Sequence, residues 1–501
     1  MKVEQITRAT RAPSDYGIME QGRRSDSVEL RYRQERIAHW DEVAVRMDNW
    51  KGWGGAYQRR LAEIFRFLCP PGARVLEIGC AAGDLLAALK PVSGMGVDFS
   101  GEMIERAEER HPELRFLRAD AHDLELDEEF DVVILSDLVN DLWDVQEVFR
   151  RVARLSTPNT RLILNLYSRL WQPPLAVAQK LGLAKPVLPQ NWLTFEDVTS
   201  LLSLVDFEII RHRTEVLLPL PVPLVAGFAN RYLAKIWPFS IGAMSHVLVA
   251  RPMPRPSDPP TAVPLVSVIV PARNEAGNIP NIFVRTPELG RGTELIFVEG
   301  GSTDNTYETI EQAIAEHPER RCQLLRQTGK GKGDAVRLGF AQANGDVLMI
   351  LDSDLTVPPE DLPRFLEVLS SGKGDFANGS RLVYPMQKEA MRFFNVLGNK
   401  FFSLAFSWLL GQPIKDTLCG TKVMWKADYE ALAANRDYFG DFDPFGDFDL
   451  LFGAANLNLK IVDVPIRYRD RTYGATNIQR WNHGWLLLKM VMFAARRIKF
   501  V

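Results

Sequence analysis

Two aspartates, Asp352 and Asp354, stand two residues apart directly after the apolar run 347–351. Such a run predicts a buried strand, so both carboxylates should lie at its carboxyl end, where open α/β sheets bind ligands. Carboxylate oxygens are the ligands that Mg²⁺ or Mn²⁺ prefers, and such an ion can neutralise a departing diphosphate. We therefore predict that Asp352 and Asp354 hold a divalent metal ion.

Further residues in the same half follow strand-like runs or lie in a flexible loop. The glycine-rich residues 329–334 form a basic loop around Lys332, which suits a diphosphate. Four residues at the ends of the two preceding runs are predicted to face a nucleotide: Pro271, Arg273, Glu275 and Glu299.

The first half carries a second set of residues at predicted strand ends. The run VLEIGCAAGD, residues 75–84, predicts a strand that enters a turn of small residues, where a ligand can approach the backbone. Asp98 ends the next strand, and a carboxylate there can accept hydrogen bonds from both hydroxyls of a ribose. The predicted nucleoside site consists of Glu77, Gly79, Gly83, Asp98, Asp120 and Ala121.

The elements that must position these residues alternate between β-branched runs and helical patterns in both halves. This alternation predicts an α/β fold with two Rossmann-like domains in tandem, each built on a parallel sheet of βαβ units. Six prolines in fourteen residues make 251–264 a stiff linker. We expect a tail or leading helix at 1–40, domains at 41–250 and 265–480, and a C-terminal helix at 481–501.

Over roughly residues 40–252 the first half resembles the class I S-adenosylmethionine-dependent methyltransferases. The shared features are an acidic residue before alternating glycines and an acidic end to the second strand, although Ala81 replaces the middle glycine. The resemblance implies that the nucleoside site binds S-adenosyl-L-methionine. His122 and Asp137 lie near the expected cleft, but no catalytic base is predicted.

From about 263 to 477 the order of the motifs resembles family 2 glycosyltransferases of the GT-A fold, particularly those like dolichol-phosphate mannosyltransferase. The resemblance implies a nucleotide-diphosphate sugar donor and inversion at the anomeric carbon. It places Arg381 near the phosphates, Lys422 and Arg471 on the acceptor or phosphate side, and Asp449 beside the acceptor.

This second half also departs from the family pattern. Glu299 and Gly300 replace a pair of aspartates that helps to hold the base and ribose. Lys422 replaces an arginine, so the positive charge stays but the planar guanidinium group is absent. Asn477 replaces a lysine. These changes suggest a subfamily with a different donor or acceptor.

Composition limits the partners. The net charge of -3 gives no reason to expect nucleic acid, and four scattered cysteines favour a reducing cytosol over a disulfide framework. The start of the chain has no apolar core typical of a secretory signal. The uncharged apolar stretches 216–230 and 401–414 are shorter than the about 18–20 residues that span a bilayer.

The C-terminal part predicts a peripheral contact with an anionic membrane. Residues 469–501 contain seven Lys or Arg and one acid, a net charge of +6. A helical wheel places one apolar face opposite Lys489, Arg496 and Arg497. The earlier segment Phe393–Leu410 is rich in aromatic residues and supports a lipid-facing surface. The apolar face of the wheel consists of Leu487, Val491, Ala494 and Ile498.

Three interpretations follow. In the first, the chain is bifunctional: it transfers a sugar to a polyprenyl phosphate or a glycan, and a methyl group to a second acceptor. In the second, the glycosyltransferase is active and the first half is a regulatory module that binds S-adenosylmethionine. In the third, both halves form an inactive scaffold, which the Asp352 and Asp354 pair argues against.

Overall fold

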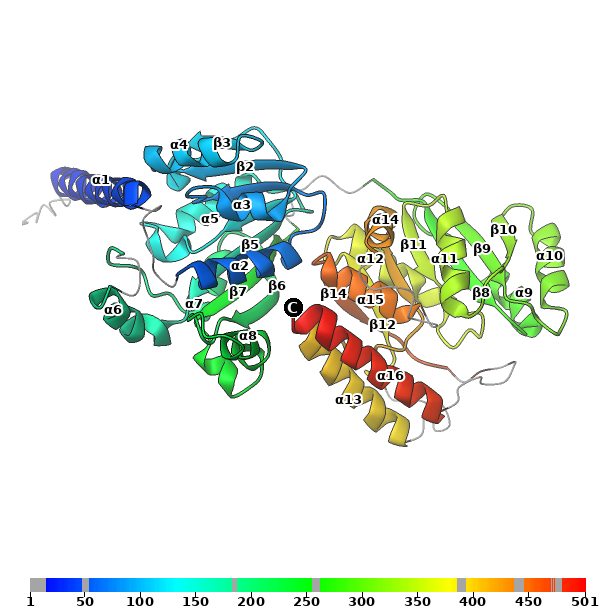
Figure 1. Ribbon diagram of the computed structural model, residues 1–501. Helices are drawn as coiled ribbons and strands as arrows, with labels where there is room; N and C mark the ends of the chain where they lie inside the picture. Colours follow the sequence, from blue (N-terminus) through cyan, green and yellow to red (C-terminus); the bar gives the residue numbers. More distant parts are fainter. Residues whose placement is uncertain are drawn as a thin grey trace, which may run out of the picture.

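The structure is a computed structural model, which describes residues 15–46, 54–182, 187–254, 262–384, 393–436, 446–469, 471, 473 and 480–501. Figure 1 shows two lobes side by side, each with a central sheet covered by helices. Each sheet has seven strands, and most neighbouring strands are parallel. The predicted fold class, two α/β domains in tandem, is confirmed.

The first sheet has the order β3-β2-β1-β4-β5-β7-β6. It is not purely parallel as predicted, because β7 runs antiparallel to both β5 and β6. The polar β6, with residues such as Glu208 and Arg213, does not alternate like an ordinary half-buried strand and was not predicted. The strands are β1 (Arg74–Ile78), β2 (Ser93–Asp98), β3 (Arg115–Arg118), β4 (Val132–Leu135), β5 (Arg161–Tyr167), β6 (Phe207–Glu215) and β7 (Ser245–Pro252).

Local signals explain where helices of the first lobe begin. The side chain of Ser100 accepts a hydrogen bond from Met103 N at the start of α4, and Asp144 does the same for Glu147 N at α5. The helices are α1 (Asp15–Arg46), α2 (Gly54–Leu68), α3 (Asp84–Leu89), α4 (Gly101–Arg110), α5 (Val145–Arg154), α6 (Gln172–Lys180), α7 (Phe195–Ser203) and α8 (Val225–Arg231).

The second sheet has the order β10-β9-β8-β11-β13-β12-β14. It is also mixed, because β13 is antiparallel to β11 and β12. Its strands are β8 (Val266–Ala272), β9 (Thr293–Glu299), β10 (Arg321–Arg326), β11 (Val347–Ile350), β12 (Phe376–Ser380), β13 (Lys422–Trp425) and β14 (Ile461–Pro465). Its helices are α9 (Ile279–Arg285), α10 (Thr306–Glu316), α11 (Lys332–Gln342), α12 (Leu362–Ser370), α13 (Phe393–Leu410), α14 (Lys426–Ala434), α15 (Asp447–Asn456) and α16 (Arg480–Ala494), which continues as a π-helical turn (Ala495–Lys499).

Buried arginines of the first lobe bind the second lobe. Arg161 and Arg251 each donate a hydrogen bond of 2.7 Å to Asp375. Arg211 donates to the main-chain oxygen of Leu410 at 3.1 Å. Because buried guanidinium groups are costly without partners, these contacts hold the two lobes together. The predicted linker boundary is wrong here, since residues 251 and 252 belong to β7.

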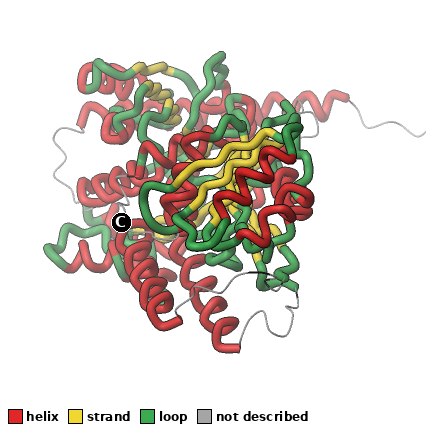
Figure 2. The backbone as a smooth tube through the Cα atoms, turned by 90° about the vertical axis from the view of Figure 1, so that its right-hand side faces the viewer, coloured by secondary structure: helices red, strands yellow, loops and turns green. Residues whose placement is uncertain are grey.

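The C-terminal helix packs on its own domain. In Figure 2, α13 and α16 run side by side at the lower edge of the molecule. The predicted apolar face is buried against α13 and the core, with Leu487 at 5% exposure and Ala494 and Ile498 at 0%. The prediction that this face meets lipid is therefore wrong. The outer face instead exposes Trp485 and Met492. No helix in the described part of the chain is long and apolar enough to cross a bilayer.

Candidate functional sites

The first lobe has a pocket where the carboxyl ends of β1, β2 and β3 meet. Gly79, Asp98, Asp120 and Ala121 line it, as predicted from their strand-end positions. His122 lines it as well. Glu77 and Gly83 are not among the lining residues. The pocket thus lies beyond the carboxyl ends of the strands, which is where open α/β sheets bind ligands.

Asp98 organises the glycine-rich turn. Its Oδ2 accepts a hydrogen bond from Ala81 N and its Oδ1 one from Ser100 N, both at 2.9 Å. Ala81 has a φ of 46°, a left-handed conformation that favours glycine, so the residue that replaces the family's glycine keeps the glycine geometry. Burial raises the pKa of Asp98 to about 6, although the two backbone hydrogen bonds act in the opposite direction.

Glu77 lies beneath the turn rather than in the pocket. It is 2% exposed, and its Oε2 has no hydrogen-bond partner among the described residues. Burial raises its pKa well above the usual value. Gly83 has a φ of 75°, and a Cβ there would lie 2.7 Å from Phe116. Gly83 is thus required by the packing of the turn, whatever the ligand.

His122 is held in place by two neighbours. Its Nδ1 lies 2.6 Å from Asp120 Oδ1, and its Nε2 accepts a hydrogen bond from Asp144 N at 3.1 Å. Both ring nitrogens are therefore engaged, which agrees with a structural role. Asp137 accepts a hydrogen bond of 2.7 Å from the hydroxyl of Tyr57.

The leading helix α1 supplies part of the pocket, which the sequence did not indicate. Tyr32, Arg33 and Arg36 line it from one side. Arg36 Nε donates to Asp141 Oδ1 at 3.0 Å, and the guanidinium lies 3.4 Å from the centre of the Tyr32 ring. Trp40 Nε1 donates to the same carboxylate. The C-terminal half of α1 thus packs on the first domain, as expected of a leading helix rather than a separate tail.

The second lobe brings Asp352 and Lys332 together. Lys332 Nζ lies 2.6 Å from Asp352 Oδ1. Burial opposes ionisation of Asp352, but the charges of Lys332, Lys422 and Arg381 outweigh it and hold its pKa below the usual value. Gly420 lies against this pair, because a Cβ there would fall 2.1 Å from Asp352 Oδ2. No larger residue fits between the loops.

Asp354 belongs to a neighbouring ion-pair group. Arg471 NH2 lies 2.7 Å from Asp354 Oδ2, and Arg471 NH1 lies 3.6 Å from Glu275 Oε1. Thr356 donates to the other oxygen of Asp354 through its backbone N and its hydroxyl. Arg471 thus links Glu275, in the loop after β8, to the Asp354 carboxylate, although Arg471 follows Asp354 by 117 residues in the sequence.

The residues predicted to face the nucleotide lie around the ends of β8 and β9. Arg273 is exposed, and the main-chain oxygen of Pro271 accepts a hydrogen bond from Ser353 Oγ at 2.9 Å. Glu299 is buried, and its Oε1 accepts a hydrogen bond from Ser302 N at 2.5 Å. Ser353 therefore connects the end of β8 to the Asp352–Asp354 segment through this hydrogen bond.

Two predicted phosphate-binding cations are engaged by other groups of the protein instead. Arg381 makes a two-pronged pair with Asp416, with Nε–Oδ2 at 2.7 Å and NH2–Oδ1 at 2.9 Å. Lys422 is 0% exposed, and its Nζ donates to Cys419 O at 2.6 Å and to Asn378 Oδ1 at 3.3 Å. Direct contact of Lys422 with an acceptor, as predicted, does not fit this burial. Both cations still act on Asp352 through their charge.

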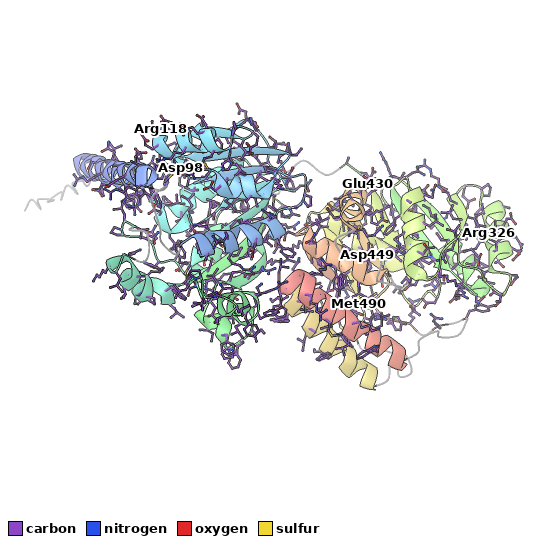
Figure 3. All side chains as sticks on the ribbon, viewed as in Figure 1. Asp98, Arg118, Arg326, Glu430, Asp449 and Met490 are labelled. Atoms are coloured by element: carbon purple, nitrogen blue, oxygen red, sulfur yellow. The ribbon has the colours of Figure 1, made fainter. Side chains whose placement is uncertain are left out.

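Asp449 lies on α15 and pairs with Arg436, whose Nε is 3.1 Å from Asp449 Oδ2. The start of α15 adjoins the start of α11, because a Cβ on Gly446 would lie 2.6 Å from Gly333 Cα. The side chain of Asp447 and residues 470 and 474–479, among them Asn477, lie outside the described residues. Figure 3 shows Asp98 and Asp449 in different lobes.

Comparison with known proteins finds a match in each half of the chain. Residues 70–193 match the model of a methyltransferase domain, and residues 267–421 match that of glycosyl transferase family 2. The chain is 30% identical over 221 residues to a dolichol-phosphate mannosyltransferase of Pyrococcus furiosus, which covers 43% of this chain and 59% of that one.

Two further similarities are weaker. An undecaprenyl-phosphate 4-deoxy-4-formamido-L-arabinose transferase of Pseudomonas aeruginosa is 34% identical over 117 residues, 23% of this chain and 34% of that one. The chain thus spans less than two thirds of these relatives. A Thermotoga maritima structure described as an S-adenosylmethionine-dependent methyltransferase has 17% identity and a TM-score of 0.35, over 43% of this chain and 99% of that one. The chain thus carries one segment that matches a methyltransferase domain and a second that matches glycosyl transferase family 2.

Proposed function

We propose that the second domain transfers a sugar from a nucleotide-diphosphate donor to a polyprenyl phosphate, with inversion at the anomeric carbon. The observation that carries the proposal is two ion pairs, Lys332–Asp352 and Arg471–Asp354, whose carboxylates stand two residues apart beyond the end of β11. A diphosphate needs this combination of charges, since its oxygens can take cations while the carboxylates take a metal ion.

The donor chemistry of this group fits Mg²⁺ or Mn²⁺. Such ions are commonly held by one or two carboxylates, and phosphate oxygens of the substrate complete the shell. Among the described residues no three His, Cys, Asp or Glu side chains form a metal site, and phosphate oxygens and water would supply the remaining ligands. When bound, the ion would neutralise charge on the leaving diphosphate.

The residues of the chain have separate tasks in this reaction. An acceptor phosphate oxygen attacks the anomeric carbon, and the bond from that carbon to the diphosphate oxygen breaks. Lys332 and Arg471, which now pair with carboxylates, turn to the phosphate oxygens and stabilise their growing charge. Arg381 acts through Asp416 as a positioning residue for the loop that holds Gly420.

The acceptor decides whether a base is needed. A polyprenyl phosphate is already an anion near pH 7, so Asp449 and Arg436 need only orient it. With a sugar hydroxyl of a glycan as acceptor, Asp449 or Asp447 would take the proton as general base. The lipid acceptor is favoured by the names of two relatives, one a dolichol-phosphate and the other an undecaprenyl-phosphate sugar transferase.

The first domain would transfer a methyl group from S-adenosyl-L-methionine to a second acceptor. The pocket lined by Asp98 and Ala121 supports cofactor binding, because it offers a carboxylate for the ribose and a small residue beside the base. The lack of an evident base among the residues of the pocket keeps a regulatory, cofactor-binding role as the second candidate. The ion pairs of Asp352 and Asp354 favour either of these two enzyme functions over an inactive scaffold.

The predicted location is the cytoplasmic face of a membrane, with peripheral attachment through the second domain. The outer sides of α13 and α16 expose large apolar residues, which suits an enzyme whose acceptor is a lipid. These residues are Phe401, Leu404, Trp408, Trp485 and Met492.

Sugar transfer is tested with the full chain, vesicles that contain undecaprenyl phosphate, and a panel of radiolabelled nucleotide sugars with Mn²⁺. We expect labelled lipid phosphate with at least one donor and none after chelation by EDTA. Vesicles with undecaprenol, which lacks the phosphate, are the matched control. Label that enters only soluble glycans, with no lipid product for any donor, would replace the lipid acceptor by a glycan.

Binding of S-adenosylmethionine should weaken as the pH falls, because Asp98 has a pKa of about 6 in the folded protein. Ribose hydroxyls donate to the ionised carboxylate, so protonation removes the acceptor. At about pH 5 roughly one carboxyl in ten stays ionised, so we expect a Kd roughly tenfold higher than at about pH 7.5.

Calorimetry of the wild type and of Asp98→Asn measures this effect. The variant should bind about tenfold more weakly near neutral pH and show a flat pH profile over the same range. The control is Glu102→Gln, an exposed carboxyl in the first turn of α4. Wild-type affinity in Asp98→Asn would contradict the placement of the ribose.

A further inference from the structure

The first domain exposes an unusual number of large apolar side chains along one edge. They lie in the segment 222–241, which contains α8, and within it Leu224 is 91% and Trp237 77% exposed. Contiguous apolar surface of this kind is rare on soluble domains and marks an interaction site. The exposed apolar residues of this segment are Val222, Leu224, Val225, Phe228, Tyr232, Ile236, Trp237, Phe239 and Ile241.

This edge continues across the domain boundary into α13. The rings of Phe228 and Tyr232 lie 5.4 Å apart, those of Tyr232 and Phe500 5.2 Å, and those of Trp408 and Phe500 5.8 Å. Arg231 Nε donates a hydrogen bond of 2.8 Å to Phe500 O and so connects α8 to the C-terminal segment. In Figure 1, α8, α13 and α16 all lie along the lower side of the molecule, and Figure 2 shows α13 and α16 there as well.

The segments that form the edge carry basic side chains and no acidic one. Neither residues 216–257 nor residues 390–415 and 471–501 contain an aspartate or glutamate, in a chain whose net charge is -3. Arg231, Arg496 and Arg497 are exposed there. An edge of exposed Trp, Phe and Leu beside cations, with no acid, matches the interface of an anionic bilayer, where aromatic rings and basic side chains are favoured.

We infer that the segment 222–241 is a membrane-inserting element of the methyltransferase domain, which enters an anionic bilayer together with α13 and α16. This deepens the proposed function, because it rests on the lipid acceptor that we assign to the second domain. The two lobes dock as one body, since Arg161, Arg211 and Arg251 join them. The methyltransferase pocket is thereby held at a set distance from the same lipid surface.

The competing occupant of this edge is a second copy of the chain. Two copies would bring two sets of cations together with no acid between them, at Arg231, Arg496 and Arg497, and like charges across an interface are unfavourable. Anionic phospholipid headgroups supply the missing negative charge, so the bilayer fits the edge better.

The test is flotation of the full chain with vesicles of phosphatidylcholine, with and without phosphatidylglycerol. The first variant, Leu224→Ser/Trp237→Ser/Phe239→Ser, removes apolar side chains from the first domain alone. The second, Phe401→Ser/Leu404→Ser, does the same on α13. The control, Val45→Ser/Val92→Ser/Val284→Ser, changes valines that are 59%, 71% and 72% exposed elsewhere.

We expect the wild type and the control to bind anionic vesicles, less so at high salt. The triple variant on the first domain should bind about tenfold or more weakly, and its loss should add to that of the α13 variant. Circular dichroism and binding of S-adenosylmethionine check that each variant is folded.

Wild-type flotation of the triple variant at 222–241 would overturn the inference. So would a dimeric wild type that becomes monomeric in this variant without a change in flotation, because the edge would then be a self-interface. Sugar transfer to a short-chain, water-soluble prenyl phosphate is measured in parallel. If the wild type transfers no sugar to this acceptor, the proposed function is wrong, but the flotation result still tests the membrane contact of residues 222–241.

Discussion

Asp354→Asn should lower the rate of sugar transfer by about 100-fold or more, because it removes a charge from the metal-binding pair. The amide oxygen can still accept the two hydrogen bonds from Thr356, so the loop keeps its shape. The variant loses the ion pair with Arg471 and half of the charge that the two aspartates offer to the metal. Single-turnover transfer at increasing Mn²⁺ concentration measures the loss.

The control for this substitution is Glu367→Gln, an exposed carboxylate on α12 in the same domain. It should transfer sugar like the wild type. If a higher Mn²⁺ concentration restores part of the rate in Asp354→Asn, weaker metal binding is the cause of the loss. Wild-type turnover in Asp354→Asn would show that the metal, if one is used, is held elsewhere.

Arg381→Met should destabilise the second domain by about 3–5 kcal/mol, because it leaves the carboxylate of Asp416 buried without its partner. Asp416 is 1% exposed, and burial opposes its charge, but Arg381 outweighs burial and holds the pKa of Asp416 below its usual value. Urea unfolding followed by circular dichroism measures the change. A second substitution, Asp416→Asn, should restore most of the lost stability, because the uncompensated charge disappears.

Arg364→Met, which removes an exposed arginine on α12, is the control and should leave stability unchanged. The result separates two roles of Arg381. A positioning residue costs stability when it is removed and is rescued by the change at Asp416. A residue that serves only the diphosphate would lose transfer while unfolding like the wild type, and that outcome would contradict the role assigned here.

The strand framework could be predicted because its signals are local. Apolar runs predicted β1, β2, β8 and β11 and placed Asp98 and Asp352 at or just beyond strand ends. The order of these motifs also predicted both families. The run at β7 predicted a strand but not its antiparallel direction, because a hydrophobic pattern does not report strand direction, and β13 was not predicted.

The remaining features depend on partners that are distant in the sequence. Because of their charge, Arg381 and Lys422 were predicted to bind phosphate. In the structure Arg381 pairs with Asp416, and Lys422 donates a hydrogen bond to Cys419 O. A helical wheel finds an apolar face but cannot tell core from lipid, so the face with Leu487 was assigned to the wrong side. Tyr32 and its neighbours on α1 reach the pocket only through tertiary packing.

The central claim, a metal-dependent diphosphate site in one domain and a nucleoside site in the other, is tested by thermal unfolding of the full chain with ligands. We expect a uridine, guanosine or thymidine diphosphate to raise the unfolding temperature only with Mn²⁺, and S-adenosylmethionine to raise it without metal, because a bound ligand stabilises the folded state by mass action. Asp354→Asn should lose the first shift and keep the second. A wild type that no nucleoside diphosphate stabilises with Mn²⁺, or that gains as much without the metal, would contradict the account.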